Sequence, residues 1–359
     1  MNSLKRLVAI ALVLVMVLSF AGCHKKNEIA VKIGDVEFTS AYYMCALMNS
    51  DASAKNKVSE SLTDEEKSSN DIDYYSKKID GKSYVKWVEE DTITSLKKIA
   101  AYKILCKKAD VKPDEEATSQ VDQYAEYYWK NYGYSQYFEP NGVGFETYKQ
   151  YMLDGYYSDC YFEKLYGEGG EKAIDSETVK SKIFEKYIVA NALNGSYEEN
   201  ATDEQKAALK AQFDGYLNDI KSKNKTFREI YMAHNNITED QLKEAEASEE
   251  DKPQDLFATV LGASDTSKAS NDYDTVNALA VGEGTVVESD SGVTLYIKQD
   301  INADPYYVKS LDMDARHLIA DENYEKYIED YIKDLKPEIN KNATKQFMVK
   351  KIVEPEAQG

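Results

Sequence analysis

Strand-like sequence in the middle of this chain separates two regions of helical periodicity, and this arrangement limits the fold more than any other feature. Residues 187–299 begin and end with short, partly β-branched apolar runs, whereas apolar residues on either side recur at helical spacing. A length of 359 residues suggests two or three domains. We therefore predict a mostly helical α+β protein with a small α/β module inserted between helical segments.

The helical regions have recognisable ends. Two short strands around Gly34-Asp35 open the pattern, and Thr39 or Ser40 can cap the helix that follows. Residues 51–80 are polar with few apolar positions, so we expect a mobile insertion there that adds little to the core. Further helices are predicted for about 25 residues from Ser83, and over Asp114–Tyr132, Glu146–Tyr166, Ser176–Tyr187 and Tyr324–Ile332.

The first 23 residues have the pattern of an export signal. Lys5 and Arg6 precede the apolar run Leu7–Leu18, which is short for a bilayer of about 30 Å but typical of a signal-peptide core. Small residues then lead to Cys23, as in the lipobox of bacterial lipoproteins, where the Cys thiol receives a diacylglycerol. We predict cleavage and lipidation at Cys23. The alternatives are a secretory signal with an incidental thiol, or an uncleaved N-terminal anchor.

The charge of the mature chain excludes some partners. Without the signal, 42 basic and 64 acidic side chains remain, a net charge of −22. A chain this acidic repels phosphate, so we expect no nucleic-acid partner. Cys45, Cys106 and Cys160 stand in apolar, helix-like contexts, either as buried thiols or as one disulfide with a leftover thiol, and their pairing stays open. Neither cysteine nor histidine spacing indicates a metal, and we expect no cofactor.

Aromatic residues are dense between Tyr124 and Phe162. They could line a crevice that grips unfolded polypeptides, because a tyrosine buries a large area at small entropic cost and keeps a polar tip. The ordinary alternative is helix packing and half-buried surface. The candidate polypeptide-binding residues are Tyr128, Trp129, Tyr132, Tyr148 and Tyr156.

The order of these parts resembles the SurA/PrsA/trigger-factor superfamily of extracytoplasmic foldases, specifically lipoproteins of low-GC Gram-positive bacteria. Val31–Thr39 resembles the N-terminal start of that family, and Phe145–Met152 with Phe162–Tyr166 resembles its late N-domain helices. Residues 186–299 resemble a parvulin-type peptidyl-prolyl isomerase module, through Thr226-Phe227, the Leu279–Glu283 segment and the strand after Gly292.

The resemblance implies a domain organisation and a function. It implies a signal peptide over 1–23, an N-terminal helical chaperone domain over 24–178, a parvulin-like domain over 179–300, and a C-terminal segment over 301–359 that packs back on the N-terminal domain. It further implies a lipid-anchored foldase on the extracytoplasmic face of the cell membrane. Its partners would be unfolded or nascent secreted polypeptides and, through Cys23, the membrane; its oligomeric state stays open.

The catalytic residues of that family do not carry over. Parvulins have one histidine on the first strand of the module and another on the last, and these positions align with Asn191 and Thr294. The resemblance therefore implies that prolyl isomerase activity is weak or lost. Ala315-Arg316-His317 looks like the start of an active parvulin, but too few residues follow it, so His317 is expected on a helix surface. The alternatives are an active isomerase and a solute- or partner-binding surface lipoprotein.

Overall fold

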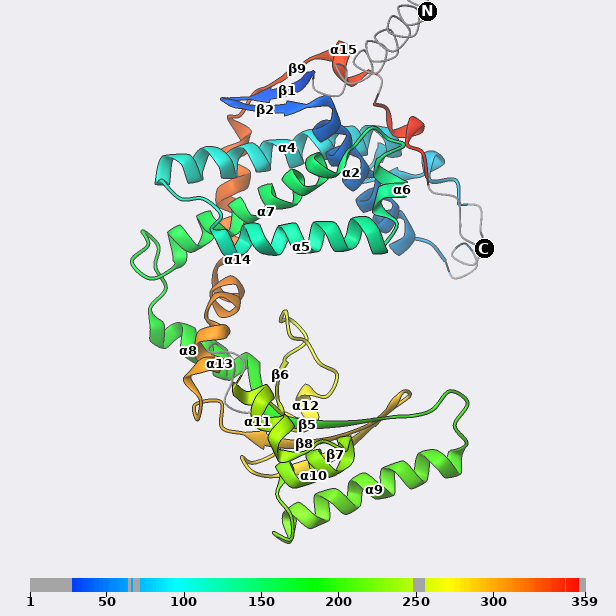
Figure 1. Cartoon of the computed structure of the whole chain (residues 1–359). Coiled ribbons are helices and arrows are strands. Elements are labelled where there is room, and N and C mark those ends of the chain that lie inside the picture. The colour runs from blue at the N-terminus through cyan, green and yellow to red at the C-terminus, as the bar shows by residue number, and fades with distance from the viewer. Residues whose placement is uncertain (1–27, 64–65, 67–71, 248–255, 346, 355–359) are drawn as a thin grey trace, which may run out of the picture. The chain divides into compact units, whose positions relative to one another are not determined.

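The computed structural model describes residues 28–63, 66, 72–247, 256–345 and 347–354. The predicted signal peptide and Cys23 lie outside these residues. The chain forms two compact units: unit 1 comprises Met1–Leu165 and Glu322–Gly359, and unit 2 comprises Tyr166–Asp321. Helices predominate over strands, as Figure 1 shows, so the predicted mostly helical α+β class is confirmed.

A three-stranded sheet joins the two ends of the chain in unit 1. The predicted hairpin is confirmed as β1 (Ile29–Ile33) and β2 (Val36–Thr39), with Gly34 supplying the positive φ of the turn. The C-terminal strand β9 (Pro337–Ile339) pairs antiparallel with β1, giving the order β2-β1-β9. This pairing is non-local, so it closes the N- and C-terminal parts of unit 1 into one body.

The predicted mobile insertion is wrong over its first half. Helix α2 (Ser40–Glu60) starts at its N-cap Thr39 and runs into the polar region, where Asp51, Ala54 and Val58 are buried. Asp51 accepts a hydrogen bond from Tyr84 at 2.8 Å. The buried face here consists of small and polar residues at helical spacing, so apolar content alone did not indicate it.

Long helices complete unit 1, and the predicted ones are confirmed. They are α4 (Tyr84–Ala109), α5 (Glu115–Asn131), α7 (Phe145–Tyr166) and the second part of α14 (Asp312–Lys333). The remaining elements of unit 1 are the short helices η1 (Tyr74–Ser76), α6 (Tyr134–Phe138), α15 (Lys341–Thr344) and η2 (Val349–Lys351), and the two-stranded pair β3 (Lys78–Ile79) and β4 (Lys82–Ser83). On α14, Tyr324 and Ile328 are buried, and the hydroxyl of Tyr324 donates to the carbonyl of Ser158 at 2.8 Å.

Unit 2 is built on a four-stranded antiparallel sheet of order β6-β5-β8-β7. Its strands are β5 (Tyr187–Ser196), β6 (Ala258–Gly262), β7 (Gly284–Ser289) and β8 (Gly292–Gln299). Its helices are α8 (Ser176–Lys186), α9 (Asp203–Lys221), α10 (Phe227–Asn235), α11 (Glu239–Ala247), α12 (Tyr273–Asn277) and α13 (Pro305–Ser310). The first part of α14 also belongs to unit 2.

The start of α14 carries a buried arginine that ties segments of unit 2 together. The Arg316 guanidinium donates to the carbonyls of Tyr166 at 2.7 Å and Ile174 at 2.9 Å, and it pairs with Asp312. The next residue, His317, is half-buried on the helix and contacts Asp321 at 2.6 Å. His317 is therefore on a helix surface, as predicted.

Candidate functional site

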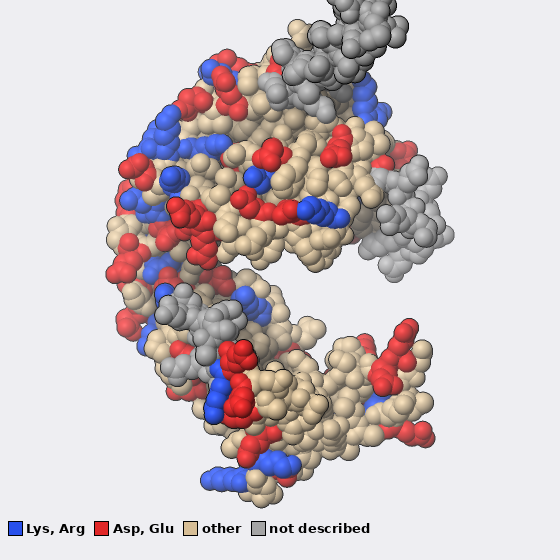
Figure 2. Space-filling model, viewed as in Figure 1, with Lys and Arg blue, Asp and Glu red and all other residues tan. Residues whose placement is uncertain are grey.

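A cluster of tyrosines on α5 and α6 is the most exposed aromatic surface that the described residues provide. The exposed fractions are 51% for Tyr124, 50% for Tyr127, 60% for Tyr132 and 37% for Tyr134. Tyr128 lies half-buried among them. We call these five residues the tyrosine surface. Figure 2 shows that on the viewed face of unit 1 charged side chains gather at one edge, while a broad area carries few of them.

The periodicity of α5 determines which aromatic rings reach solvent. Val121, Ala125 and Trp129 follow one another at i, i+4 spacing and are buried, so they form the face that packs on unit 1. Tyr124 and Tyr127 point away from that face because they are offset from it by roughly 100° per residue. Asp114 caps the start of α5, where its carboxylate accepts a hydrogen bond from the Ala117 amide at 2.7 Å. The position of this cap determines which residues of α5 face the core.

The tyrosines contact one another edge to face and in stacks. The Tyr128 ring centroid lies 6.4 Å from that of Tyr124, 5.4 Å from that of Tyr132 and 5.7 Å from that of Tyr134. The Tyr127 ring centroid lies 5.4 Å from that of Tyr132. These contacts restrict the side-chain rotamers, and less entropy is lost when a ligand covers the surface.

Buried rings form a floor beneath the tyrosine surface. Trp129 lies 5.5 Å from Tyr148 and 6.2 Å from Phe138, measured between ring centroids. Tyr134 rests on this cluster, with its ring 5.6 Å from Tyr148 and 5.8 Å from Phe138. The exposed rings are thus held in place by close packing below them.

The structure sorts the five predicted polypeptide-binding residues into surface and core. Tyr128 and Tyr132 belong to the tyrosine surface. Trp129 and Tyr148 are 9% and 6% exposed, so the prediction that they contact polypeptides is wrong: their rings are the floor. Tyr156 is half-buried on α7, where burial and nearby groups including Tyr124 raise its pKa.

Sequence reasoning missed three members of the tyrosine surface. Tyr124, Tyr127 and Tyr134 lie within or at the edge of the aromatic-rich stretch and are exposed, but they are not among the five predicted residues. For Tyr124 and Tyr127 the signal was present, because both lie off the buried row of α5 that contains Ala125 and Trp129. Tyr134 lies on the separate helix α6, so the phase of α5 does not predict its exposure.

The sheet of unit 2 places Asn191 and Thr294 on opposite faces. Asn191 pairs with Ile297, whereas Thr294 pairs with Asn194, in one continuous register. Asn191 and Asn194 are three residues apart on β5, so their side chains point to opposite sides of the sheet. The two positions that align with the parvulin histidines therefore do not share a face of the sheet.

The two faces of this sheet differ in chemistry. On the Asn191 face, Leu193 and Leu295 pack on Phe213 of α9, and within the described residues the buried Asn191 Oδ1 has no hydrogen-bond partner. On the Thr294 face, Ala190 and Tyr296 pack with α12. Ile188 and Leu261 belong to the same apolar cluster, beside which Thr294 and Tyr296 of β8 contribute polar atoms.

Both of these polar side chains donate a hydrogen bond to a neighbouring residue. Thr294 Oγ1 donates to Asn194 Oδ1 at 2.9 Å, and the Tyr296 hydroxyl donates to Asp272 at 2.8 Å. Burial and the Asp272 carboxylate raise the pKa of Tyr296. The two described histidines, His234 and His317, lie on α10 and α14, so no imidazole is on this face.

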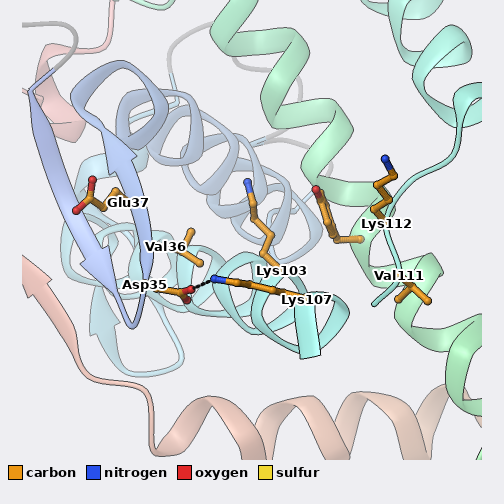
Figure 3. Close-up of a pocket in the computed structure, with 8 residues that line it drawn as sticks. Asp35, Val36, Glu37, Lys103, Lys107, Val111 and Lys112 are labelled. Carbon is orange, nitrogen blue, oxygen red and sulfur yellow. Dashed lines mark hydrogen bonds and ion pairs between the residues drawn. The ribbon is translucent and has the colours of Figure 1, made fainter. Parts of the chain in front are cut away.

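A cleft of about 480 Å³ opens in unit 1 between the β1–β2 turn and the end of α4. Figure 3 shows Lys107 from α4 meeting Asp35 of the turn, with Lys103 beside it. Lys103 forms an ion pair with the buried Asp154 at 2.9 Å. Carboxylates pair with Lys103 and Lys107, while the third lysine that lines the cleft, Lys112, faces solvent beside them.

The described residues show free thiols at Cys45, Cys106 and Cys160. No group of three or more potential ligands is arranged to hold a metal ion within that part of the chain. Among the described helices, none combines the length and apolar character needed to cross a bilayer.

No family model matches the sequence, and no curated protein matches it. Among solved structures, the fold is similar to that of the foldase protein PrsA from Lactococcus lactis, at 14% sequence identity and a TM-score of 0.37, covering 89% of this chain and 99% of that one. It is also similar to PrsA from Bacillus subtilis, at 14% identity and a TM-score of 0.35, covering 76% of this chain and 97% of that one.

Proposed function

We propose that this protein is a lipid-anchored extracytoplasmic foldase that holds unfolded secreted polypeptides on the tyrosine surface. The observation that carries the proposal is the exposure of four tyrosines, between 37% and 60%, on one rigid part of unit 1. Contiguous exposed aromatic surface is rare in monomeric proteins and marks interaction sites. Tyrosine accepts many side chains because it is both apolar and polar.

Holding an unfolded chain requires no catalytic group. Binding lowers the concentration of free unfolded polypeptide and so slows its aggregation by mass action. The sequence of the N-terminal 23 residues supports export and lipidation at Cys23. A diacylglycerol on that thiol supplies two acyl chains, which anchor a protein stably where a single chain does not.

In this proposal unit 2 is a degenerate parvulin-like module. Its four antiparallel strands with flanking helices support that assignment, together with the sequence resemblance stated above. The absence of histidine from β5 and β8 supports weak or lost prolyl isomerase activity. Activity as a peptidyl-prolyl isomerase is therefore the second candidate, and an isomerase assay separates it from holding.

The test is suppression of aggregation by the purified chain of residues 24–359. Several unfolded clients are diluted from denaturant, and light scattering is followed with and without a near-stoichiometric amount of this protein. We expect scattering to fall with each added increment of protein. Unchanged scattering for every client would overturn the proposed function.

A further inference from the structure

We propose that the tyrosine surface selects unfolded segments rich in lysine and arginine, an inference that rests on the proposed function and adds the chemistry of the client. The local charge is the starting point. Residues 114–146, which include α5 and α6, contain seven acidic side chains and a single basic one, Lys130. Lys149 of α7 pairs with two of the seven, Asp122 and Glu146. Relative to its length, this segment therefore has a larger excess of acidic over basic side chains than the whole chain, which has 64 acidic and 44 basic residues.

The helix places carboxylates on both borders of the tyrosines. Glu116 lies two turns before Tyr124 on the same side of α5. Gln120 lies between them, and its amide donates a hydrogen bond to the Glu116 carboxylate at 3.3 Å. Glu126 lies on the neighbouring row beside Tyr127, and its ion pair with Lys130 is solvent-exposed on both sides. Beyond the other end of α6, Glu139 is exposed.

A cationic side chain can use both components of this surface at once. Its alkyl stem covers a tyrosine ring, its charge is attracted to the face of the ring, and its head reaches a bordering carboxylate. This chain makes the same contact internally: Lys206 lies 5.3 Å from the ring centroid of Tyr197, and Lys172 lies 5.9 Å from that of Tyr166. The exposed pair between Glu126 and Lys130 is weak enough for a client cation to replace Lys130.

Segments of the opposite charge are disfavoured by the same groups. An acidic segment over the tyrosines would bring its carboxylates close to Glu116, Glu126 and Glu139, and like charges at short range cost free energy in proportion to their closeness. In this proposal the tyrosine rings bind unfolded segments of any sequence, and the bordering carboxylates strengthen the binding of basic segments and weaken that of acidic ones.

The test uses three labelled, unstructured peptides of equal length that share their apolar residues and carry lysine, glutamine or glutamate at the remaining positions. Fluorescence anisotropy gives the Kd of each for the chain of residues 24–359. We expect the lysine peptide to bind about tenfold more tightly than the glutamine peptide at low salt, with the glutamate peptide weakest. The differences should shrink as ionic strength rises.

Two charge-matched triple variants locate the effect. The first removes the bordering carboxylates, Glu116→Gln/Glu126→Gln/Glu139→Gln, and the second removes three exposed ones from α14, Glu322→Gln/Glu325→Gln/Glu329→Gln. Both change the net charge equally. We expect the first to weaken the lysine peptide about fivefold and the second to change its Kd less than about twofold.

Equal Kd values for the three peptides, or equal effects of the two variants, would overturn the selection by charge. That failure is distinct from failure of the proposed function. If charge selection alone is absent, all three peptides bind alike; if the protein is no foldase, none of them binds.

Discussion

The Thr294 hydroxyl donates to the amide oxygen of Asn194 at 2.9 Å, and the two residues lie directly opposite each other on β8 and β5. The bond holds the two side chains together on the sheet face that also carries Tyr296. A prolyl isomerase must lower a rotational barrier near 20 kcal/mol, which requires polar groups free to act on the twisted amide.

We therefore expect little catalysis of Xaa-Pro isomerisation. In a protease-coupled peptide assay, the acceleration should stay below about tenfold, which corresponds to about 1.4 kcal/mol of the barrier. An acceleration of several orders of magnitude would show that catalytic groups other than Asn191 and Thr294 are present, and it would make the isomerase the main activity.

The core of unit 1 should depend on Asp154. This buried carboxylate accepts from the Tyr42 hydroxyl at 2.8 Å and from Gln150 at 2.7 Å, and it pairs with Lys103. Asp154→Ala leaves these donors without their acceptor, so we expect a loss of about 3 kcal/mol in the free energy of unfolding. Asp35→Ala, which removes only the exposed partner of Lys107, should cost less than about 1 kcal/mol.

Urea unfolding followed by tryptophan fluorescence measures this difference. Both tryptophans of the chain, Trp87 and Trp129, belong to unit 1, so the signal reports on that unit. Equal midpoints for the Asp154→Ala and Asp35→Ala variants would contradict the assigned role of Asp154.

Alkaline pH should destabilise unit 1 through buried tyrosines. Burial, and then the nearby Glu89, raises the pKa of Tyr43 from 10.0 to about 12. Between these values the unfolded chain releases the proton while the folded chain keeps it, so the unfolded state binds fewer protons and stability falls as pH rises. Tyr42 and Tyr84 act in the same direction, since burial raises the pKa of each.

The measurement is the urea midpoint of unit 1 as a function of pH. From about pH 10 to about pH 12 we expect a loss of about 2 kcal/mol from Tyr43. Tyr43→Phe removes the titrating group and should flatten this part of the profile. A variant profile as steep as that of the unchanged chain would exclude Tyr43 as a source of the slope.

The thiols should differ in reactivity. Burial raises the pKa of Cys45 and raises that of Cys106 to about 12; these two thiols are buried, whereas Cys160 is half-buried. Since the thiolate is the reactive form, alkylation of the native chain of residues 24–359 should begin at Cys160. Peptide mapping by mass spectrometry identifies the site; modification of Cys45 as fast as Cys160 would contradict its burial.

Helices and their ends were largely predictable from the sequence. The hairpin around Gly34 and the start of α5 at Asp114 carry local signals, namely a tight turn and an N-cap, that depend on few distant contacts. The strand β6 (Ala258–Gly262) was missed, because only its last two residues are buried and the surrounding sequence is polar. Its place is determined by pairing with β5, which is a tertiary contact.

The candidate site was predictable only in part. An aromatic-rich stretch is visible in the sequence, but whether Trp129 or Tyr127 faces solvent depends on the phase of α5, which the buried row including Ala125 determines. On β5, Asn191 lies on the opposite sheet face from Thr294, because successive side chains of a strand alternate between the two faces. The sequence alone therefore does not determine which face of α5 or of β5 each of these residues occupies.

The most direct measurement compares aggregation suppression by two double variants of the chain of residues 24–359. Tyr127→Ser/Tyr132→Ser removes two exposed rings from the tyrosine surface, and Phe184→Ser/Val281→Ser removes two exposed apolar side chains from unit 2. Exposed substitutions change stability by about 0.5 kcal/mol or less, so both variants should fold. We expect the tyrosine variant to lose most of the suppression while the unit 2 variant keeps it; full suppression by the tyrosine variant would contradict the account.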